Sequence, residues 1–344
     1  MRRFTLGQLI LCCGSCVACT VALGLLMKYT GWHHAVDPLL MPDDGDAVDG
    51  SAGLVDWNAY LAERNAHYRR LPAQDVQDRR LADQAKLLEA YKTDPAAFVR
   101  DYSRRQTFLF DAVIDAKNMV RVGTFGDGGK WVSDPQALKP GTVVYSFGVG
   151  HDISFDADMA GLFGCEVHAF DPAPSVERAF AHCRPGQQVG KGTFSYHAVG
   201  LGPASLEPGK ADDLVLEGRT CQVKRLGELA AELGHAHVDI LKIDIEGGET
   251  AALGEILASG TLAKLSVKQL LVEFHLWDDE QFSSFVQIIG LLRRQGYLIF
   301  RKEFNPKDAR RCAEFAFLGA NSTLVNPNSC STRSDSRSAV AAER

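Results

Sequence analysis

The chain has 344 residues and carries 37 Lys and Arg against 43 Asp and Glu, which gives a net charge of −6. This acidic balance argues against a general nucleic-acid-binding protein, because neutralising phosphates requires a concentrated basic surface. Hydrophobic residues make up 46% of the chain, enough for a large core, so disorder throughout is excluded as well. We therefore expect a globular domain with attached segments.

The N-terminal segment is strongly apolar. Residues 4–27 contain no charged side chain and follow Arg2 and Arg3. A helix of about 20 apolar residues is long enough to cross a bilayer, so we predict a transmembrane signal-anchor over residues 1–28. The basic residues before it predict a cytosolic N-terminus and a lumenal remainder, in the endoplasmic reticulum or Golgi. The alternative is a signal peptide that is cleaved, which predicts a secreted protein.

Four further segments follow in chain order. Residues 29–55 are rich in Asp, Gly and Pro and predict a linker, and residues 56–117 show helical spacing of apolar positions and predict a helical extension. Residues 118–324 predict the main domain, and the Ser-rich tail 325–344 predicts disorder. Five cysteines outside the apolar stretch allow one or two disulfides in a lumenal compartment, and Asn321 begins a glycosylation sequon.

The main domain alternates short apolar runs with helical patterns. This alternation predicts an α/β fold with a doubly wound, mostly parallel sheet, in which ligands bind at the carboxyl ends of the strands. The expected strands are residues 142–147, 166–170, 193–199, 238–245, 267–275, 297–300 and 313–318, and the expected helices are 175–183, 249–259 and 279–295.

Two features follow the first two expected strands. Gly148 and Gly150 end the first strand, where glycine lets the backbone approach a ligand closely. Ile153 stands where a dinucleotide fingerprint has its third glycine, so an NAD site is disfavoured. Asp171 ends the second strand and could accept two hydrogen bonds from a ribose diol. The alternatives are an ordinary glycine turn and an Asp that begins a turn or caps the next helix.

Charged side chains also cluster on the fourth and fifth expected strands. Strand alternation predicts that Lys242, Asp244 and Glu246 share one face, with Gly247 and Gly248 following, and that Glu273 and His275 share a face of the next strand. Charges in a buried strand are costly unless they are paired or functional, so we predict a working cluster. The alternatives are a structural Lys242–Asp244 ion pair and a structural histidine.

Five stretches in this order, SFGVG, HAFDP, HAVGL, DILKIDIEGGE and VEFH, resemble the FkbM-like class I S-adenosylmethionine-dependent methyltransferases. The segment from Arg121 to Val132, with its DGGKW sequence, is similar to the methyltransferase-like 24 branch. The resemblance covers residues 118–320. It implies the seven-stranded, Rossmann-like methyltransferase sheet, whose last strand, here residues 313–318, runs antiparallel.

The resemblance also implies roles for single residues. Gly148 and Gly150 would lie against the methionine moiety of S-adenosyl-L-methionine, and Asp171 would hold the ribose. Ala198 would lie beside the adenine, within the segment 197–199. Asp244 and Glu246 would lie near the methyl group, and the loop with Asp127 and Gly128 would cover the cofactor.

The sequence departs from the family pattern in two places. Ser146 stands where many class I enzymes have an acid that contacts the methionine amine, unless Asp152 or Asp127 supplies that contact. The Asn/Asp-Pro-Pro-Tyr/Phe motif, which acts on exocyclic amines, does not follow the fourth strand. Methyl transfer to a base or glutamine nitrogen is therefore disfavoured.

We expect methyl transfer to a hydroxyl of a sugar or another small acceptor. Glu246 or His275 would be the base, Asp244 would orient it, and Lys242 would neutralise the cluster. We expect no metal, with Mg or Mn bound by Asp244, Glu246 and His275 as the alternative. The expected partners are a small-molecule or glycan acceptor and the membrane, and no nucleic acid. The competing interpretations are a non-catalytic lumenal scaffold on a degenerate methyltransferase fold and another nucleotide-using α/β enzyme.

Overall fold

The computed structural model describes residues 74–124, 128–204, 214–305, 307–319 and 322–325. The predicted anchor, the linker and almost all of the C-terminal tail therefore lie outside the described residues, as do Asp127 and Asn321. No helix within the described ranges combines the length and the apolar character that a membrane span requires.

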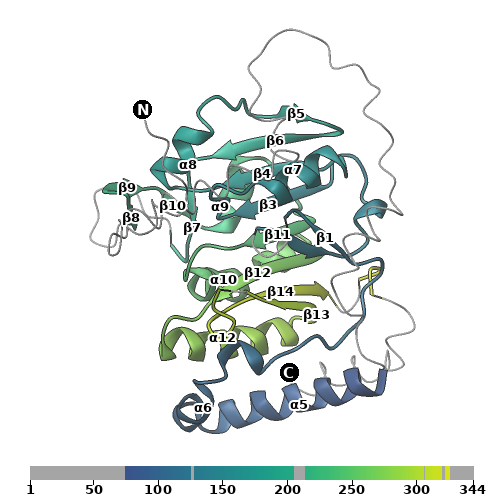
Figure 1. The fold of residues 1–344 in the computed structure, drawn as a ribbon, viewed down its shortest axis with the longest axis vertical. Helices are drawn as coiled ribbons and strands as arrows, with labels where there is room; N and C mark the ends of the chain where they lie inside the picture. Colours follow the sequence, from purple (N-terminus) through teal and green to yellow (C-terminus); the bar gives the residue numbers. More distant parts are fainter. Residues whose placement is uncertain (1–73, 125–127, 205–213, 306, 320–321, 326–344) are drawn as a thin grey trace, which may run out of the picture. The chain divides into compact units, whose positions relative to one another are not determined.

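An eight-stranded sheet forms the centre of the described part of the chain (Figure 1). Its five middle strands are parallel, and the strand next to them is antiparallel to both of its neighbours. The strands, in their order across the sheet, are β13 (Tyr297–Phe304), β14 (Cys312–Gly319), β12 (Gln269–His275), β11 (Ile240–Ile243), β3 (Val143–Phe147), β4 (Glu166–Phe170), β6 (Gly192–His197) and β5 (Gln187–Val189).

This order confirms the predicted doubly wound sheet. The seven expected strands are present, the expected last strand β14 runs antiparallel to β12, and β5 adds an eighth strand at the edge. Strands β3, β11 and β12 are buried along their whole length, which explains why they consist largely of apolar residues. The chain order reverses around β3, between β4 and β11, so the expected ligand edge lies at the carboxyl ends of these strands.

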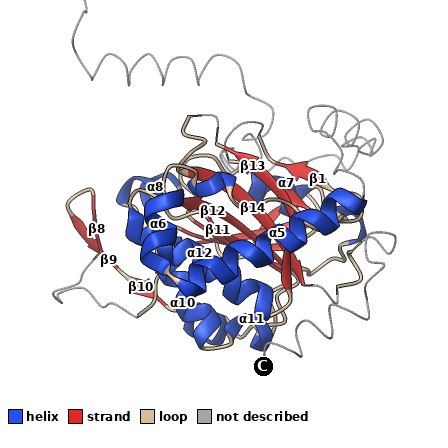
Figure 2. Cartoon of the chain, turned by 90° about the horizontal axis from the view of Figure 1, so that it is seen from below, coloured by secondary structure: helices blue, strands red, loops and turns tan. Residues whose placement is uncertain are grey.

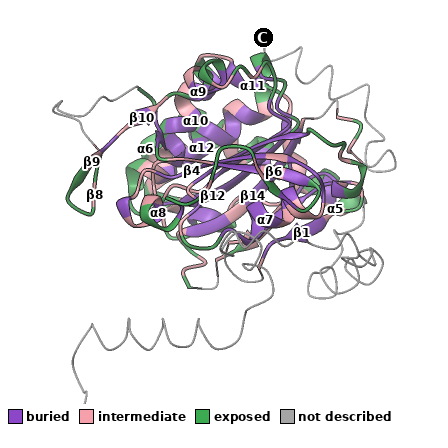
Figure 3. Ribbon diagram, turned by 90° about the horizontal axis from the view of Figure 1, so that it is seen from above, coloured by how far each residue is buried: buried purple, intermediate pink, exposed green. Residues whose placement is uncertain are grey.

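Helices cover one face of the sheet (Figure 2). Side chains of α9 (Leu226–Glu232), α10 (Glu249–Ala258) and α12 (Asp279–Arg294) form the main core with the strands, and α5 (Gln74–Thr93) and α6 (Pro95–Tyr102) contact α12. Asp94 and Asp278 cap the first turns of α6 and α12 through their side chains. Figure 3 shows the buried strands beneath the more exposed outer helices.

The opposite face is covered by α7 (Ser154–Gly161) and by the hairpin of β1 (Val120–Val122) and β2 (Lys130–Val132). Strand β2 lies against β12 and β14, and α7 lies against β4, β5 and β6. The hairpin thus brings Lys130 over the carboxyl half of the sheet. The remaining described elements are α8 (Pro174–Ala179), α11 (Thr261–Lys264), β7 (Gly200–Leu201), β8 (Leu214–Leu216), β9 (Arg219–Cys221), β10 (Val223–Lys224) and two 3₁₀ turns (Gln106–Phe108, Pro135–Ala137).

The structure corrects one strand boundary that matters for the site. The strand expected over residues 238–245 is shorter, and β11 ends at Ile243. Asp244 and Glu246 therefore lie in the turn that follows, and Glu246 has a left-handed φ of 56°. Within the described residues, Cys165, Cys183, Cys221 and Cys312 form no disulfide.

Candidate functional site

The glycine turn after β3 forms the first part of the site. Gly148 has a φ of 74°, and a Cβ there would lie 1.5 Å from the backbone oxygen of Asp244, so only glycine fits. Gly150 has a φ of 58°, and a Cβ there would have no heavy atom within 4 Å. The turn therefore packs against the end of β11 at one glycine and faces open space at the other.

Asp171 joins this turn to the end of β4. One of its carboxylate oxygens accepts a hydrogen bond from the Gly150 N–H at 2.9 Å, and the other accepts one from the Ala173 N–H at 2.9 Å. The Asp171 N–H donates to the backbone oxygen of His197 at 3.1 Å, and the exposed Ala198 comes next in the chain. Gly150, Asp171 and Ala198 thus lie along one edge, at the carboxyl ends of β3, β4 and β6.

The loop before β2 approaches the same turn. A Cβ on Gly128 would lie 2.6 Å from the Asp152 carboxylate, and Asp152 accepts a hydrogen bond from the Thr124 hydroxyl at 2.7 Å. The DGGKW segment is therefore close to the residues that follow Gly150. Asp152, one of the two acids expected to compensate for Ser146, caps the Ser154 N–H at 3.0 Å. Asp127, the other, lies outside the described residues.

The acidic residue Asp156 lies beside Ser146. Asp156 of α7 is 1% exposed, and burial raises its pKa, while Lys242 and Ser146 lower it. The buried acid next to Ser146 thus comes from the helix that follows the strand and not from the strand itself. The stretch SFDADMAG places two acids in an otherwise apolar helix, and this pattern could have indicated Asp156 from the sequence.

The turn after β11 brings three of the expected catalytic residues together. Ligand atoms of Asp244, Glu246 and His275 all lie within 4.8 Å of one another, which is close enough to share a divalent cation. The Glu246 side chain is 80% exposed, and its Oε2 lies 3.5 Å from His275 Nε2. Alternation along a strand predicted this grouping, but the turn produces it, because β11 has already ended.

His275 is held in the charged form by its neighbours. Its Nδ1 lies 3.0 Å from Oε1 of Glu249, which is fully buried at the start of α10. Burial of the imidazole acts against its charge, but the hydrogen bond to Glu249 and the charges of Glu249, Glu273 and Asp244 outweigh it and raise the pKa of His275 to about 9. At neutral pH this ring carries two N–H donors and cannot accept a proton.

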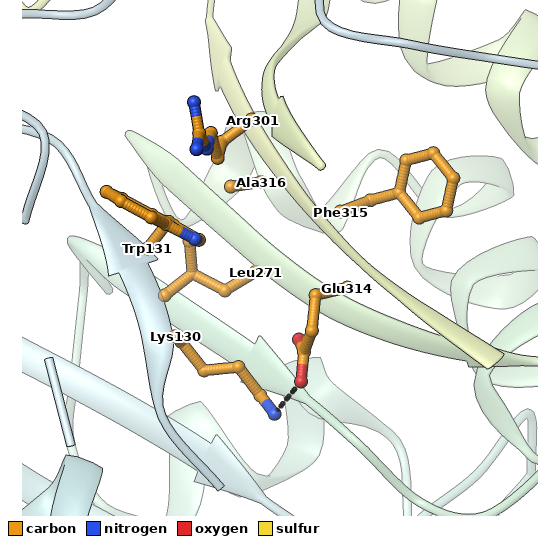
Figure 4. Close-up of a pocket in the computed structure, with 7 residues that line it drawn as sticks. All are labelled: Lys130, Trp131, Leu271, Arg301, Glu314, Phe315 and Ala316. Atoms are coloured by element: carbon orange, nitrogen blue, oxygen red, sulfur yellow. Dashed lines mark hydrogen bonds and ion pairs between the residues drawn. The ribbon is translucent and has the colours of Figure 1, made fainter. Parts of the chain in front are cut away.

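Lys130 is a residue of the site that sequence reasoning did not assign. Its ammonium, fully buried, lies 2.9 Å from Asp244 Oδ2 and 3.6 Å from Glu273 Oε2, and it forms an ion pair with Glu314 of β14 (Figure 4). Burial of the Asp244 carboxyl acts to raise its pKa, but Lys130 and Lys242 outweigh this effect and lower it to about 2. Glu314 is a single charge in an apolar strand, and this pattern could have indicated a buried ion pair from the sequence.

Lys242 braces the glycine turn. Its ammonium donates to the backbone oxygen of Gly148 at 2.8 Å and lies 3.9 Å from Asp244 Oδ2. The shorter Asp244 contact is the one to Lys130, so the Lys242–Asp244 ion pair, given above as an alternative, is the weaker of the two. Lys242 is 3% exposed, which makes it a positioning residue for the turn.

Trp277 was also missed. It follows His275 by two residues, is 44% exposed, and its ring centroid lies 5.5 Å from that of His275. Its indole N–H donates to the backbone oxygen of Glu246 at 3.4 Å. An exposed aromatic plane therefore lies against the turn that carries Glu246.

A family model described as a methyltransferase domain matches residues 63–319, so the match includes the helices that we expected to form a separate extension. Two curated proteins, both described as probable methyltransferase-like protein 24, are similar to this chain over 134 residues. The human protein is 32% identical and the Rattus norvegicus protein 31% identical, with 39% of this chain and 32% of each relative covered. The chain thus spans about a third of the length of the curated relatives it matches.

Likeness to solved structures is weaker. A fibrillarin pre-rRNA processing protein of Methanococcus jannaschii shows 14% identity and a TM-score of 0.34, covering 54% of this chain and 69% of that one. A magnesium protoporphyrin IX methyltransferase of Synechocystis shows 11% identity and a TM-score of 0.31, covering 76% and 91%. The fold therefore rests on the sheet order described above.

Proposed function

Because the chain belongs to the methyltransferase-domain family, we propose that it transfers the methyl group of S-adenosylmethionine to a hydroxyl oxygen of a sugar or another small acceptor. The observation that carries the oxygen assignment is the Glu246 carboxylate, which is exposed at the sheet edge beside a charged histidine. An exposed carboxylate can take a hydroxyl proton from an acceptor that arrives from solvent.

The residues at the glycine turn fit the cofactor. Space beside Gly150 leaves room for the methionine moiety, since no heavy atom lies within 4 Å of a Cβ there. Asp171 is 7% exposed, and each of its oxygens retains a lone pair beyond its backbone N–H partner for the ribose diol. Ala198, exposed at the end of β6, leaves room for the adenine. When bound, S-adenosylmethionine supplies an already activated methyl carbon, and the acidic residues nearby favour its positive charge.

The pKa directions select the base among the clustered groups. His275, with a pKa of about 9, is already protonated at neutral pH, and Asp244, with a pKa of about 2, is a weak base. Partial desolvation raises the pKa of Glu246, and Asp244 adds to this effect against the charge of His275. Glu246 therefore accepts the hydroxyl proton, and His275 donates a hydrogen bond that orients it. This role replaces the expectation that either residue could be the base.

Trp277 supports a ring-shaped acceptor. An exposed indole offers a flat apolar surface on which the C–H face of a sugar or a small aromatic ring packs. The guanidinium carbon of Arg311 lies 5.1 Å from the Trp277 ring centroid and the His275 ring 5.5 Å from it, so an acceptor would pack on the part of the indole that these two groups leave exposed. An acceptor stacked there places its hydroxyls next to Glu246.

The test is an acceptor screen with labelled S-adenosylmethionine and the full-length chain. On an acceptor found in the screen, Glu246→Gln should lower kcat by about 10²–10⁴-fold, the usual contribution of a general base. Its affinity for S-adenosylmethionine should stay within about twofold, because Glu246 acts on the acceptor. The control is Glu89→Gln, which changes an exposed carboxylate on α5. Unchanged turnover in Glu246→Gln contradicts the base assignment, and a failure to bind S-adenosylmethionine favours the scaffold interpretation.

We propose a lumenal setting for this reaction. The support is the apolar stretch 4–27, which lies outside the described residues, together with the basic residues before it. The membrane, through that stretch, and a glycan or small-molecule acceptor are the proposed partners. A glycosidase-sensitive mass shift that disappears in Asn321→Gln tests this setting.

A further inference from the structure

A cluster of metal-ligand side chains lies apart from the methyl-transfer site. Glu166 and His168 belong to β4, and His235 follows α9 in the turn that leads to β11. Tyr145 of β3, which contacts His235, belongs to the core on the helix-covered face of the sheet, whereas Lys130 lies over the opposite face. Glu166 and His168 lie five and three residues before Asp171, which places them about 16 and 10 Å along the strand from the cofactor edge.

The distances within the cluster suit a small metal ion. His168 Nε2 lies 3.1 Å from Glu166 Oε1, and His235 Nε2 lies 3.5 Å from the same oxygen. All three ligand atoms lie within 4.8 Å of one another. Zinc binds imidazole nitrogen and carboxylate oxygen at about 2.0–2.2 Å, so two ligands of a tetrahedral site are separated by about 3.4 Å. The separations of 3.1 and 3.5 Å lie close to this value.

The other ring nitrogens of both histidines already have partners. His168 Nδ1 lies 3.0 Å from His197 Nε2, and His235 Nδ1 lies 2.7 Å from the Tyr145 hydroxyl. Such contacts fix the orientation of a ligating imidazole and direct its second nitrogen to the metal. They leave the Nε2 atoms of His168 and His235 facing Glu166.

The cluster is also accessible to an ion. The Glu166 side chain is 41% exposed, which provides a route from solvent.

We propose that Glu166, His168 and His235 form a zinc site, in which water takes the fourth position and the ion ties β4 to the segment between α9 and β11. Two imidazoles and one carboxylate suit Zn²⁺ better than Mg²⁺ or Ca²⁺, which prefer oxygen ligands.

The test is direct zinc titration of the full-length chain after its metals have been removed with a chelator. Zinc chloride is added in competition with a chromophoric chelator, and one equivalent is expected to bind. Cobalt(II) is expected to give the visible absorption of a tetrahedral site. His235→Ala should weaken zinc binding at least 10-fold, whereas His237→Ala, which changes a more exposed histidine two residues away, should bind as the unaltered chain does.

A second variant separates this site from the methyl-transfer cluster. Glu246→Gln removes one ligand of the Asp244–Glu246–His275 set and should leave the zinc affinity unchanged. Absence of zinc binding, equal affinity in His235→Ala, or loss of zinc in Glu246→Gln each overturns the proposal. If His235→Ala fails to fold, Glu166→Gln is tested in its place, because it changes a partly exposed side chain of the same ligand set. Weaker zinc binding in Glu166→Gln supports the proposal, and unchanged affinity overturns it.

Discussion

His275 shows how a single residue is set by the groups around it. Its pKa rises from 6.5 to about 9 in the folded chain, since Glu249, Glu273 and Asp244 outweigh the cost of burial. A raised histidine pKa stabilises the fold fully below pH 6.5, and this contribution disappears as the pH rises through about 9. At about 1.4 kcal/mol per pKa unit, we expect about 3 kcal/mol of stability to be lost across this interval.

Urea unfolding between pH 6 and pH 10 measures this loss. His275→Gln should show a flatter dependence of the unfolding free energy on pH, because glutamine does not titrate. His237→Gln serves as the control, since His237 is 58% exposed. Parallel pH profiles for His275→Gln and the unaltered chain would show that the histidine is not charged in the fold.

For single residues, the sequence predicted which side chains belong to the site better than it predicted how they are arranged. Lys242, Asp244, Glu246 and His275 were all expected at the site because charges in apolar strands are costly, and the last three are brought together in the structure. Glu249 and Lys130 were not assigned to the site from the sequence. Their roles depend on contacts with residues such as Asp244 that pattern alone does not place.

The turn between β3 and α7 allows two glycines to be compared within one element. Gly148→Ala puts a Cβ into the Asp244 carbonyl, so it should prevent folding or lower stability by several kcal/mol. Gly150→Ala meets no neighbour, so it should lose only about 1–2 kcal/mol from its left-handed backbone. The new methyl group in Gly150→Ala projects into the proposed cofactor space and should weaken S-adenosylmethionine binding at least 10-fold.

Unfolding in urea and calorimetry with S-adenosylmethionine separate the two effects. Gly141→Ala is a matched control, because Gly141 also has a positive φ with no heavy atom near its Cβ but precedes β3, at the other end of the strand. If Gly150→Ala binds the cofactor as well as Gly141→Ala does, the open side of this turn is not the cofactor site.

Lys130, on the β1–β2 hairpin, lies close to three carboxylates that are buried or partly buried, those of Asp244, Glu273 and Glu314. Within the described ranges, no other cation approaches all three. Lys130→Met leaves these carboxylates together without it. We expect a loss of about 3–5 kcal/mol at pH 8, since a buried charge left without its partner is strongly destabilising. The loss should be smaller at pH 5, because the carboxylates can then take up protons.

Chemical unfolding at the two pH values tests the hairpin's role. Lys264→Met, on the exposed side of α11, is the control and should change stability by less than about 0.5 kcal/mol. The double variant Lys130→Met with Glu314→Gln should recover part of the loss. Equal losses at both pH values would mean that Lys130 contributes packing and not charge.

The hairpin also shows which elements escape sequence reasoning. Its strands have three residues each, too few for a period-two pattern to be distinguished from a loop. The long strands β3 and β12, by contrast, are mostly apolar, because both faces of the sheet are covered. Their positions were therefore predicted to within a few residues, except that glycine and the left-handed Glu246 end β11 early.

At the scale of the whole molecule, the proposed cofactor site joins strands that are distant in the sequence. Gly150, Asp171 and Ala198 follow β3, β4 and β6, and Asp244 follows β11. A ligand bound to all of them interacts with the folded state only, so its binding free energy adds to folding stability. At 100 times its dissociation constant, S-adenosylmethionine should stabilise the chain by about 2.7 kcal/mol.

Thermal unfolding with and without S-adenosylmethionine measures this coupling, and we expect the Tm to rise by several degrees. The increase should be absent in Gly150→Ala, which keeps the fold but obstructs the proposed site, and present in Glu246→Gln, which alters only the acceptor side. These two variants separate cofactor binding from catalysis. Gly150→Ala should lose the Tm increase because its cofactor site is obstructed, whereas Glu246→Gln should keep it because only the base is changed. An unaltered chain whose Tm does not respond to the cofactor would leave the sheet edge without its proposed ligand and the Glu246 carboxylate without a methyl donor.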